Sequence, residues 1–317
     1  MGLTLITGAS GFVGSHLAAD MRNRGMPIRA ISRSESQGST KIQSYAPETD
    51  WRPFLHEVDT VVHLAARVHV MRDTEADPLN VFRIANVDAT LNLARQAAFA
   101  GVSRFIFMST VKVNGEETQP GEPFTNLDPR NPQDPYAISK AEAEVGLLDV
   151  GRQTKMDVAI IRPPLVFGPR VGGNFATLMK WTERGCPSLF SHVKNKRSMI
   201  YVGNLTDFVI AVISYADPVK RHFLISDQPA LSTDELFAQL RTATGRAPRA
   251  IPVPRVLLDL ADTLTGNNKT LRRLLSSLEI DDQETRKTFS WKQPFEFTAA
   301  ITETVSTANR TYSLSQG

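Results

Sequence analysis

The stretch Leu3-Thr-Leu-Ile-Thr7-Gly8-Ala-Ser-Gly11-Phe-Val-Gly14 decides the fold. A short apolar run that stops at a glycine indicates a buried strand over residues 3–7, and residues 15–25 have the pattern of a helix. Glycines between a strand and a helix allow a tight turn and let backbone amides approach a pyrophosphate at the positive end of the helix. The G-x-x-G-x-x-G spacing therefore predicts a dinucleotide-binding turn, with a plain tight turn as the alternative. We expect this turn to contact the cofactor through Gly8, Ser10, Gly11, Phe12 and Val13.

A second strand is predicted at residues 27–31, and the chain then reaches Ser32 and Arg33. In such folds an acid at this strand end binds the ribose 2′-hydroxyl of NAD, whereas an arginine accommodates the 2′-phosphate of NADP. No acid follows the strand, and a guanidinium group matches the geometry of a phosphate. Arg33 therefore favours NADP(H), with NAD(H) as the second choice and an exposed loop arginine as the simpler interpretation.

Three further apolar runs, at residues 58–66, 103–110 and 156–162, alternate with helical stretches at 78–100 and 135–151. This alternation predicts an α/β fold, a Rossmann-type doubly wound parallel sheet covered by helices on both faces. Beyond residue 172 the pattern loosens into short strands and helices. We therefore expect a cofactor-binding domain over residues 1–170 and a smaller mixed lobe over 171–317, some elements of which return to the first domain.

Small and polar residues stand where two of these strands end. Ligand sites in a doubly wound sheet lie at the carboxyl ends of the strands. Leu64, Ala65 and Ala66 close the third strand and would let a cofactor pass nearby, and Thr110 closes the fourth. His63 lies within the apolar run, so we expect it to be a packed structural histidine.

The stretch Asp134-Pro-Tyr136-Ala-Ile-Ser-Lys140 begins a helix, with a capping aspartate followed by proline at the first helical position. Residues four apart share one face of a helix, so Tyr136 and Lys140 point the same way. An ammonium group beside a phenol favours the phenolate, which predicts a lowered pKa for Tyr136 and proton exchange near neutral pH. On its own, the same spacing is more often an ordinary surface tyrosine and lysine.

Composition excludes several classes of function. The net charge is +3 with acidic and basic residues mixed along the chain, which argues against nucleic-acid binding. Cys186 is the only cysteine, which suits a reducing cytoplasm and leaves no cysteine cluster for a metal. No apolar stretch reaches the roughly eighteen residues of a membrane span, and no signal-peptide pattern is present. We expect a cytoplasmic protein without a metal site or a membrane anchor.

Several of these motifs, in this order, resemble those of the extended short-chain dehydrogenase/reductases. These are the NAD-dependent epimerase/dehydratase enzymes that act on nucleotide sugars. The motifs are the glycine turn, residues 59–66, Ser109-Thr110, Tyr136 with Lys140, and residues 162–169. The resemblance implies that Thr110 hydrogen-bonds the substrate oxygen, that Tyr136 is the acid/base, and that Lys140 holds the nicotinamide ribose and lowers the tyrosine pKa.

The resemblance also extends past the fifth strand. It implies cofactor contacts from Pro163 and Val166 and contacts with the diphosphate of a UDP-sugar from Asn174 and Arg197. A helix cap is the alternative for Asn174, and a surface charge is the alternative for Arg197. Family members commonly form homodimers through two helices, here those predicted at 78–100 and 135–151.

The resemblance leaves the reaction to be chosen. Dehydratases of the family carry Asp-Glu directly after the threonine, where this chain has Val111 and Lys112, so 4,6-dehydration is disfavoured. A reductase consumes a reduced cofactor at every turnover, so Arg33, as a sign of NADP(H), favours reduction over 4-epimerisation, for which NAD is usual.

Finer similarity points the same way. Residues 63–69, 112–116 and 162–168 resemble a bacterial subgroup that reduces C4 of UDP-2-acetamido-2,6-dideoxy-4-ketohexoses. Its products are UDP-N-acetylquinovosamine or UDP-N-acetylfucosamine for surface polysaccharide such as lipopolysaccharide O-antigen. Our main prediction is such a C4 reductase, with a UDP-sugar 4-epimerase as the alternative and a non-catalytic dinucleotide-binding protein as a weaker one.

Two positions depart from the wider family. Asn114 stands where many members have the tyrosine of a V-Y-G motif. Ser44-Tyr45 stands where an aspartate often lies near the adenine, which leaves the adenine contacts open.

Overall fold

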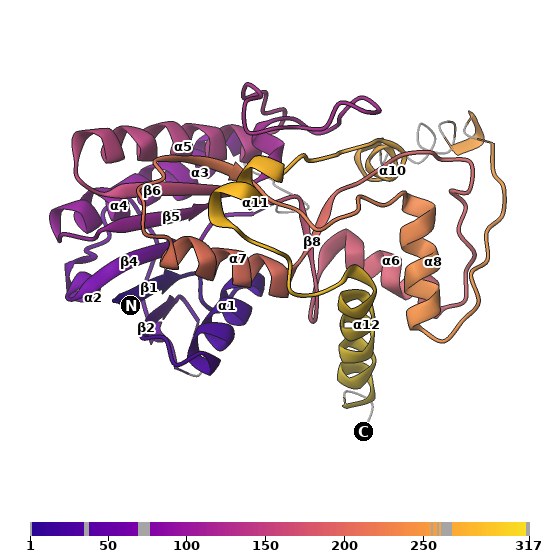
Figure 1. The fold of residues 1–317 in the computed structure, drawn as a ribbon, viewed down its shortest axis with the longest axis horizontal. Coiled ribbons are helices and arrows are strands. Elements are labelled where there is room, and N and C mark those ends of the chain that lie inside the picture. The colour runs from indigo at the N-terminus through magenta and orange to yellow at the C-terminus, as the bar shows by residue number, and fades with distance from the viewer. Residues whose placement is uncertain are drawn as a thin grey trace.

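A seven-stranded parallel sheet forms the centre of the computed structural model, which describes residues 2–34, 38–68, 77–254, 256–258, 260 and 268–314 (Figure 1). The strand order is β3-β2-β1-β4-β5-β6-β9. The strands are β1 (Leu3–Thr7), β2 (Ile28–Ser32), β3 (Thr40–Lys41), β4 (Val58–His63), β5 (Arg104–Met108), β6 (Asp157–Arg162) and β9 (Arg221–Leu224). Strand order reverses beside β1, as in a doubly wound Rossmann-type sheet, so the predicted fold class is confirmed.

Helices cover both faces of the sheet (Figure 1). One face carries α1 (Phe12–Asn23) and α7 (Val202–Ser214), whose apolar side chains pack with Ile6, Val62 and Ile106. The other face carries α4 (Ala89–Phe99) and α5 (Pro135–Gln153), which pack with Val61 and Phe105. Strands buried on both faces have continuous apolar sequences, so their positions can be predicted from the sequence.

The helix predicted over residues 78–100 is interrupted. It consists of α3 (Pro78–Arg83), a π-helical segment η1 (Ile84–Asp88) and α4. Asn86, in the π segment, is buried, and its side-chain amide bonds both the N–H and the C=O of Arg67, at 2.8 and 3.1 Å, and the hydroxyl of Ser139. The widened turn thus fastens the segment after β4 to α5, which a regular helix would not do. Such π segments often lie near functional sites.

The second half of the chain builds a smaller layer beside the sheet (Figure 1). The two-stranded sheet β7 (Leu165–Phe167) with β8 (Met199–Tyr201) meets helices around an aromatic cluster that contains Phe167, Phe175 and Phe237. The helices of this half include α6 (Gly173–Glu183), α8 (Thr233–Ala243), α10 (Asn268–Leu275), α11 (Gln283–Phe289) and α12 (Phe297–Leu314). The chain returns to the first layer through α7 and β9, and Phe289 at the end of α11 packs on Phe208 of α7.

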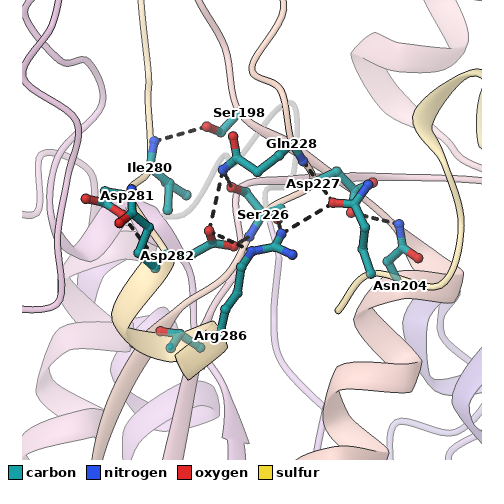
Figure 2. Close-up of polar contacts among 12 residues, drawn as sticks. Ser198, Asn204, Ser226, Asp227, Gln228, Ile280, Asp281, Asp282 and Arg286 are labelled. Atoms are coloured by element: carbon teal, nitrogen blue, oxygen red, sulfur yellow. Dashed lines mark hydrogen bonds and ion pairs between the residues drawn. The ribbon is translucent and has the colours of Figure 1, made fainter. Parts of the chain in front are cut away.

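A polar network joins α11 to the end of β9 (Figure 2). The Asp282 carboxylate accepts hydrogen bonds from the Ser226 N–H at 3.0 Å and from Arg286 Nε at 2.9 Å, and Arg286 also donates to the Ser226 carbonyl. Next to it, buried Asp227 accepts from the Tyr201 N–H and from Asn204 Nδ2, both at 2.8 Å. These contacts hold the smaller layer against the sheet through side chains distant in sequence.

Two searches of the described residues bear on function. No helix among them is both long enough and apolar enough to cross a bilayer. Within the same residues, no group of three or more histidine, cysteine or carboxylate side chains is placed to hold a metal ion.

Candidate active site

The glycine turn after β1 has no room for side chains. Gly8 has a φ of +70°, and a Cβ added there would lie 2.7 Å from the Ala65 nitrogen. A Cβ added at Gly14 would lie 2.2 Å from the Gly8 carbonyl oxygen. The turn therefore brings the start of α1 close against β1, leaving helix N–H groups available to an anion as the predicted dinucleotide site requires.

A cavity of about 450 Å³ opens above this turn, at the carboxyl ends of β1, β2 and β4. Seven predicted cofactor contacts line it, namely Gly8, Ser10, Gly11, Arg33, Leu64, Ala65 and Ala66. The side chains of Phe12 and Val13 instead pack against the apolar clusters, so these two residues would meet a dinucleotide through the backbone at the start of α1. The glycine cradle and the lining residues fit a nicotinamide dinucleotide.

Two aromatic residues, Tyr45 and Trp51, form one wall of this cavity, and neither is a predicted cofactor contact. The Tyr45 hydroxyl donates to the Ile31 carbonyl at 2.9 Å and accepts from the Gly8 N–H at 3.2 Å. Trp51 stacks on Tyr45, with 5.5 Å between ring centroids, and the guanidinium carbon of Arg33 lies 6.0 Å from the Tyr45 ring centre. Trp51 is 1% exposed, and its Nε1 has no hydrogen-bond partner among the described residues. Tyr45 thus stands at one of the two positions where many family members have an aspartate near the adenine, and Trp51 stacks on it.

His63 lies at the back of the cavity and is structural, as predicted. Its two ring nitrogens meet the hydroxyls of Thr7 at 2.7 Å and Thr90 at 3.0 Å. Burial, with a smaller effect of nearby Lys140, lowers the pKa of His63 to about 3, so the ring is neutral at physiological pH.

The three predicted catalytic residues come from the end of β5 and the start of α5. Thr110 caps the short 3-10 turn η2 (Val111–Val113), and Asp134 caps α5 by accepting from the Ala137 N–H at 2.7 Å. The Tyr136 ring packs edge-on against Phe82 of α3. One turn later, Lys140 is 2% exposed; its Nζ donates to the Met108 carbonyl at 2.8 Å and lies 4.3 Å from the Phe107 ring centre.

The predicted direction of the tyrosine pKa is wrong for this chain. Burial raises the pKa of Tyr136, and the nearby Asp134 carboxylate raises it further. Burial also lowers the pKa of Lys140 to about 7, against the opposing effect of Glu144. Helical spacing accounts only for the attraction between ammonium and phenolate, whereas burial disfavours both charges.

A buried ion pair joins α5 to the end of β6. The side chains of Glu144 and Arg162 are both 0% exposed and form a direct ion pair. Glu144 accepts hydrogen bonds from Arg162 Nε at 2.8 Å and from the Ser109 hydroxyl at 2.6 Å. Tyr136, Lys140 and Glu144 follow one another at four-residue spacing, so one face of α5 carries all three. The same four-residue spacing in the sequence could have indicated that Glu144 lies on the face of Tyr136 and Lys140.

A second cavity, of about 430 Å³, lies beside the loops that carry the catalytic residues. Its lining residues are Asn114, Gly115, Glu116, Glu117, Phe124, Asn131, Gln133, Arg272, Arg273 and Ser276. Arg272 pairs with Glu117 at 2.8 Å, and Arg273 lies 3.6 Å from Glu116. Neither arginine was predicted as a site residue, because both stand on α10, far along the chain.

The two predicted diphosphate contacts lie in different surroundings. Arg197 adjoins the second cavity by donating to the Ser276 carbonyl at 3.0 Å, and burial together with the charge of Arg273 lowers its pKa to about 10. It is thus a half-buried arginine with a fixed partner, not a free surface charge. Asn174 is exposed near the start of α6 and is not among the residues described as lining this cavity.

The remaining two predicted cofactor contacts follow β6. The Pro163 carbonyl accepts from the Val111 N–H at 3.0 Å, which ties this loop to the segment after Thr110. Val166, in β7, is half-buried and packs against both the sheet cluster and the aromatic cluster.

Comparison with known proteins agrees with this geometry. Residues 4–226 match the model of the NAD dependent epimerase/dehydratase family. UDP-glucose 4-epimerase from Vibrio cholerae is 37% identical over 296 residues, which cover 92% of this chain and 90% of that protein.

Two solved UDP-glucose 4-epimerases share the fold. The Thermotoga maritima enzyme with UDP-glucose has a TM-score of 0.78 at 21% identity and covers 98% of this chain and 99% of its own. The Thermus thermophilus enzyme with NAD has a TM-score of 0.76 at 22% identity, with 97% and 99% covered. The chain belongs to the NAD-dependent epimerase/dehydratase family.

Proposed function

We propose that this protein is a UDP-sugar 4-epimerase that works with NAD(H). The observation that carries the proposal is the similarity to the Vibrio cholerae UDP-glucose 4-epimerase over 92% of the chain. In the structure, Thr110 follows the carboxyl end of β5, and Tyr136 and Lys140 lie on α5. The reduction predicted from Arg33 is the second candidate, because that arginine does line the dinucleotide cavity.

The cofactor's place is supported by the glycine turn and by the cavity above it. The start of α1 would hold the pyrophosphate, and Leu64, Ala65 and Ala66 would line its path. When bound there, the dinucleotide would supply reversible hydride transfer at C4 of the sugar. NAD is preferred in this proposal because the Thermus thermophilus neighbour is a complex with NAD.

Tyr136 would take the proton from the sugar O4 and give it back. Thr110, half-buried at the end of β5, would hold the same oxygen. Because burial raises the pKa of Tyr136, its phenolate needs a cation nearby, and Lys140 lies one helical turn away. A pKa of about 7 leaves a substantial fraction of Lys140 charged at neutral pH, and charges attract strongly in such a buried site.

The segment after Thr110 supports epimerisation over dehydration. Val111 is buried and cannot transfer a proton, and Lys112 forms ion pairs with Asp134 at 2.6 Å and Glu116 at 3.2 Å. Neither residue offers the acid and base that removal of a C6 hydroxyl group requires.

The second cavity supports a diphosphate-bearing substrate. Arg197, Arg272 and Arg273 concentrate positive charge there, and planar guanidinium groups bind phosphate oxygens well. Glu116 and Glu117 neutralise part of this charge, so a substrate diphosphate would replace them as the partner of α10. Asn174 lies outside this arrangement, so we leave it without a role.

Dimerisation, a cytoplasmic location and a role in surface polysaccharide remain predictions from the sequence. For the dimer, the face formed by η1 and α5 presents Ile84, 44% exposed, and Val145, 50% exposed. Both lie on the helices proposed for the subunit contact.

The proposal is tested by incubating purified protein with UDP-glucose and, separately, with UDP-N-acetylglucosamine, each with catalytic NAD. Proton NMR should show the C4 epimer accumulating to equilibrium without net cofactor reduction. If neither sugar is converted, while a UDP-4-keto-6-deoxyhexosamine is reduced with stoichiometric loss of NADPH absorbance, the C4 reductase is correct instead.

A further inference from the structure

Lys112 lies between the two segments that carry the catalytic residues. It stands in the 3-10 turn η2, two residues after Thr110, and its Nζ lies 2.6 Å from Asp134 Oδ2. Asp134 caps α5 and stands two residues before Tyr136. This ion pair thus joins the segment after β5 to the start of α5, and it is equally close in sequence to Thr110 and to Tyr136.

Each member of the ion pair is also bonded next to a catalytic residue. On one side, the Lys112 N–H donates to Thr110 Oγ1 at 3.3 Å. On the other side, Asp134 Oδ1 accepts from the Ala137 N–H at 2.7 Å, while Oδ2 accepts from Lys112 Nζ. Three consecutive contacts therefore connect the hydroxyl of Thr110 with the first turn of α5, which carries Tyr136.

The contact at Thr110 also determines how its hydroxyl can be used. Because Oγ1 accepts from the Lys112 N–H, the hydroxyl hydrogen is left to donate elsewhere. Donation to the sugar O4 fits the proposed function, since that oxygen gains negative charge as Tyr136 takes its proton. The backbone of Lys112 thus orients the Thr110 side chain for the role proposed for it.

The ion pair between Lys112 and Asp134 is largely shielded from water. The side chain of Asp134 is 8% exposed and that of Lys112 is 19% exposed. Glu116 also pairs with Lys112, at 3.2 Å, but it is 31% exposed and shares its charge with Arg273. Water and salt weaken exposed ion pairs, whereas shielded ones are screened much less. Asp134 is therefore the partner that fixes the position of the ammonium group.

We propose that Lys112 is a positioning residue, which holds Tyr136 at the correct distance from Thr110 for both to meet one sugar oxygen. The role rests on the proposed function, because it concerns the oxygen from which Tyr136 takes a proton, and Lys112 acts on it through Asp134. Reacting groups must be held in close alignment, and a displacement of about 1 Å can cost about 100-fold in rate. Loss of the ion pair should therefore lower turnover more than it lowers binding.

The test measures kcat and KM for the epimerisation of UDP-glucose and UDP-N-acetylglucosamine by the full chain with NAD. Lys112→Met removes the ammonium group and keeps a long side chain. Asp134→Asn removes the opposite charge and keeps a helix cap, because asparagine caps helices as well as aspartate does. The double variant removes both charges. Lys112→Arg retains a cation for Asp134 and is the conservative variant.

Lys112→Met and Asp134→Asn should each lower kcat by about 5- to 50-fold, because a loosened segment is displaced by less than about 1 Å. KM and the affinity for NAD, measured by calorimetry, should stay within about 2-fold of the parent values, since their contacts are separate. The double variant should be no slower than the slower single variant, because both substitutions remove the same contact. Lys112→Arg should remain within about 3-fold of the parent, because arginine can pair with the carboxylate.

Glu142→Gln is the matched control. Glu142 also lies on α5 and pairs with a neighbouring element, through Arg83 of α3, at the same distance of 2.6 Å. That ion pair does not lead to Thr110. The kcat and KM of Glu142→Gln should therefore equal those of the parent.

Three outcomes would overturn the proposed role of Lys112. In the first, kcat of Asp134→Asn or Lys112→Met stays within about 2-fold of the parent value. In the second, Lys112→Arg is as slow as Lys112→Met, so the cation is not what matters. In the third, the two single losses multiply in the double variant, which would show that the substitutions act independently. If Lys112→Met does not fold, as judged by thermal unfolding, Asp134→Asn and Lys112→Arg decide by the same criteria.

Failure of the proposed function has a different signature. A parent protein that epimerises neither sugar refutes the epimerase but leaves the contacts of Lys112 open to the same test. The same variants are then compared in the C4 reduction of a UDP-4-keto-6-deoxyhexosamine, for which Thr110 and Tyr136 would again have to meet one sugar oxygen.

Discussion

The buried carboxylate of Glu144, on α5, gives the sharpest stability prediction. In Glu144→Gln the side chain keeps its shape but loses its charge, so Arg162 is left as a charged group with a side chain 0% exposed. The glutamine amide also brings N–H donors where the Ser109 hydroxyl and Arg162 already donate. Removing one partner of a buried ion pair costs about 3–5 kcal/mol because the other charge is stranded.

We therefore expect Glu144→Gln to lower the free energy of unfolding by about 4 kcal/mol. At roughly 2 °C per kcal/mol for a long chain, this corresponds to a drop in melting temperature of about 8 °C at pH 7. Glu142→Gln, on the same helix, is the control. Glu142 pairs with Arg83 at the surface, where side-chain exposures of 36% and 46% limit the effect to about 1 kcal/mol or less.

The effect should depend on pH with a definite sign. Burial acts to raise the pKa of Glu144, but hydrogen bonds from Arg162 and Ser109 outweigh it and hold that pKa below its ordinary value of 4.5. The folded protein thus favours the ionised carboxylate, so its contribution is present above pH 4.5 and is lost as pH falls through the lower folded value. The gap between parent and Glu144→Gln should shrink in acid.

Thermal unfolding followed by circular dichroism at pH 7 and in acid measures both points. A melting temperature for Glu144→Gln within about 2 °C of that for Glu142→Gln would refute the reasoning, since it would mean that Arg162 finds another counter-charge at little cost. A gap that stays constant into strong acid would show that the charge of Glu144 is not what stabilises the fold.

Two further predictions concern the site, and one concerns the polar network at the end of β9. Tyr136→Phe should lower turnover by about 10²-fold or more while NAD affinity, measured by calorimetry, is unchanged; surviving turnover would remove Tyr136 from the acid/base role. Arg33→Ala should weaken NADP binding and leave NAD binding nearly intact, and an equal loss of both would mean that Arg33 does not read the ribose phosphate. Burial raises the pKa of Asp227 from 3.8 to about 7, so the folded chain holds a proton that the unfolded chain has released, and this carboxyl lowers stability as pH rises from about 4 to 7. The melting temperature of the parent should therefore fall relative to Asp227→Asn across that range, and a constant difference would contradict the assignment.

Sequence located the sheet because its strands are buried on both faces. Residues 3–7 were predicted as a strand, and β1 spans Leu3–Thr7; β4, β5 and β6 begin within one residue of the predicted positions. The helix that carries Tyr136 and Lys140 was predicted from its capping aspartate and proline, and this helix, α5, begins at Pro135. In each case the deciding signal was local.

Features that depend on distant contacts were not predicted. In the π segment the Asn86 amide bonds Arg67 and Ser139, and no local sequence pattern indicates these contacts. Arg272 meets Glu117 across 155 residues of chain, so only the fold brings that ion pair to the second cavity.

The error in the tyrosine pKa has the same origin. Spacing places Tyr136 beside Lys140, but burial of both side chains, which spacing does not reveal, sets the direction of their pKa shifts. The prediction of a reductase rested on the exposed Arg33 and on similarity to a reductase subgroup, whereas the relatives favour the epimerase.

The most direct test of the central claim is an isotope experiment with UDP-glucose carrying deuterium at C4. Epimerisation through Tyr136 removes and returns that hydrogen at the same carbon within one site, so the UDP-galactose formed should retain deuterium at C4 by NMR and mass spectrometry. Product with hydrogen from solvent at C4, or no C4 epimer from either UDP-glucose or UDP-N-acetylglucosamine, would contradict the proposal that this chain is a UDP-sugar 4-epimerase.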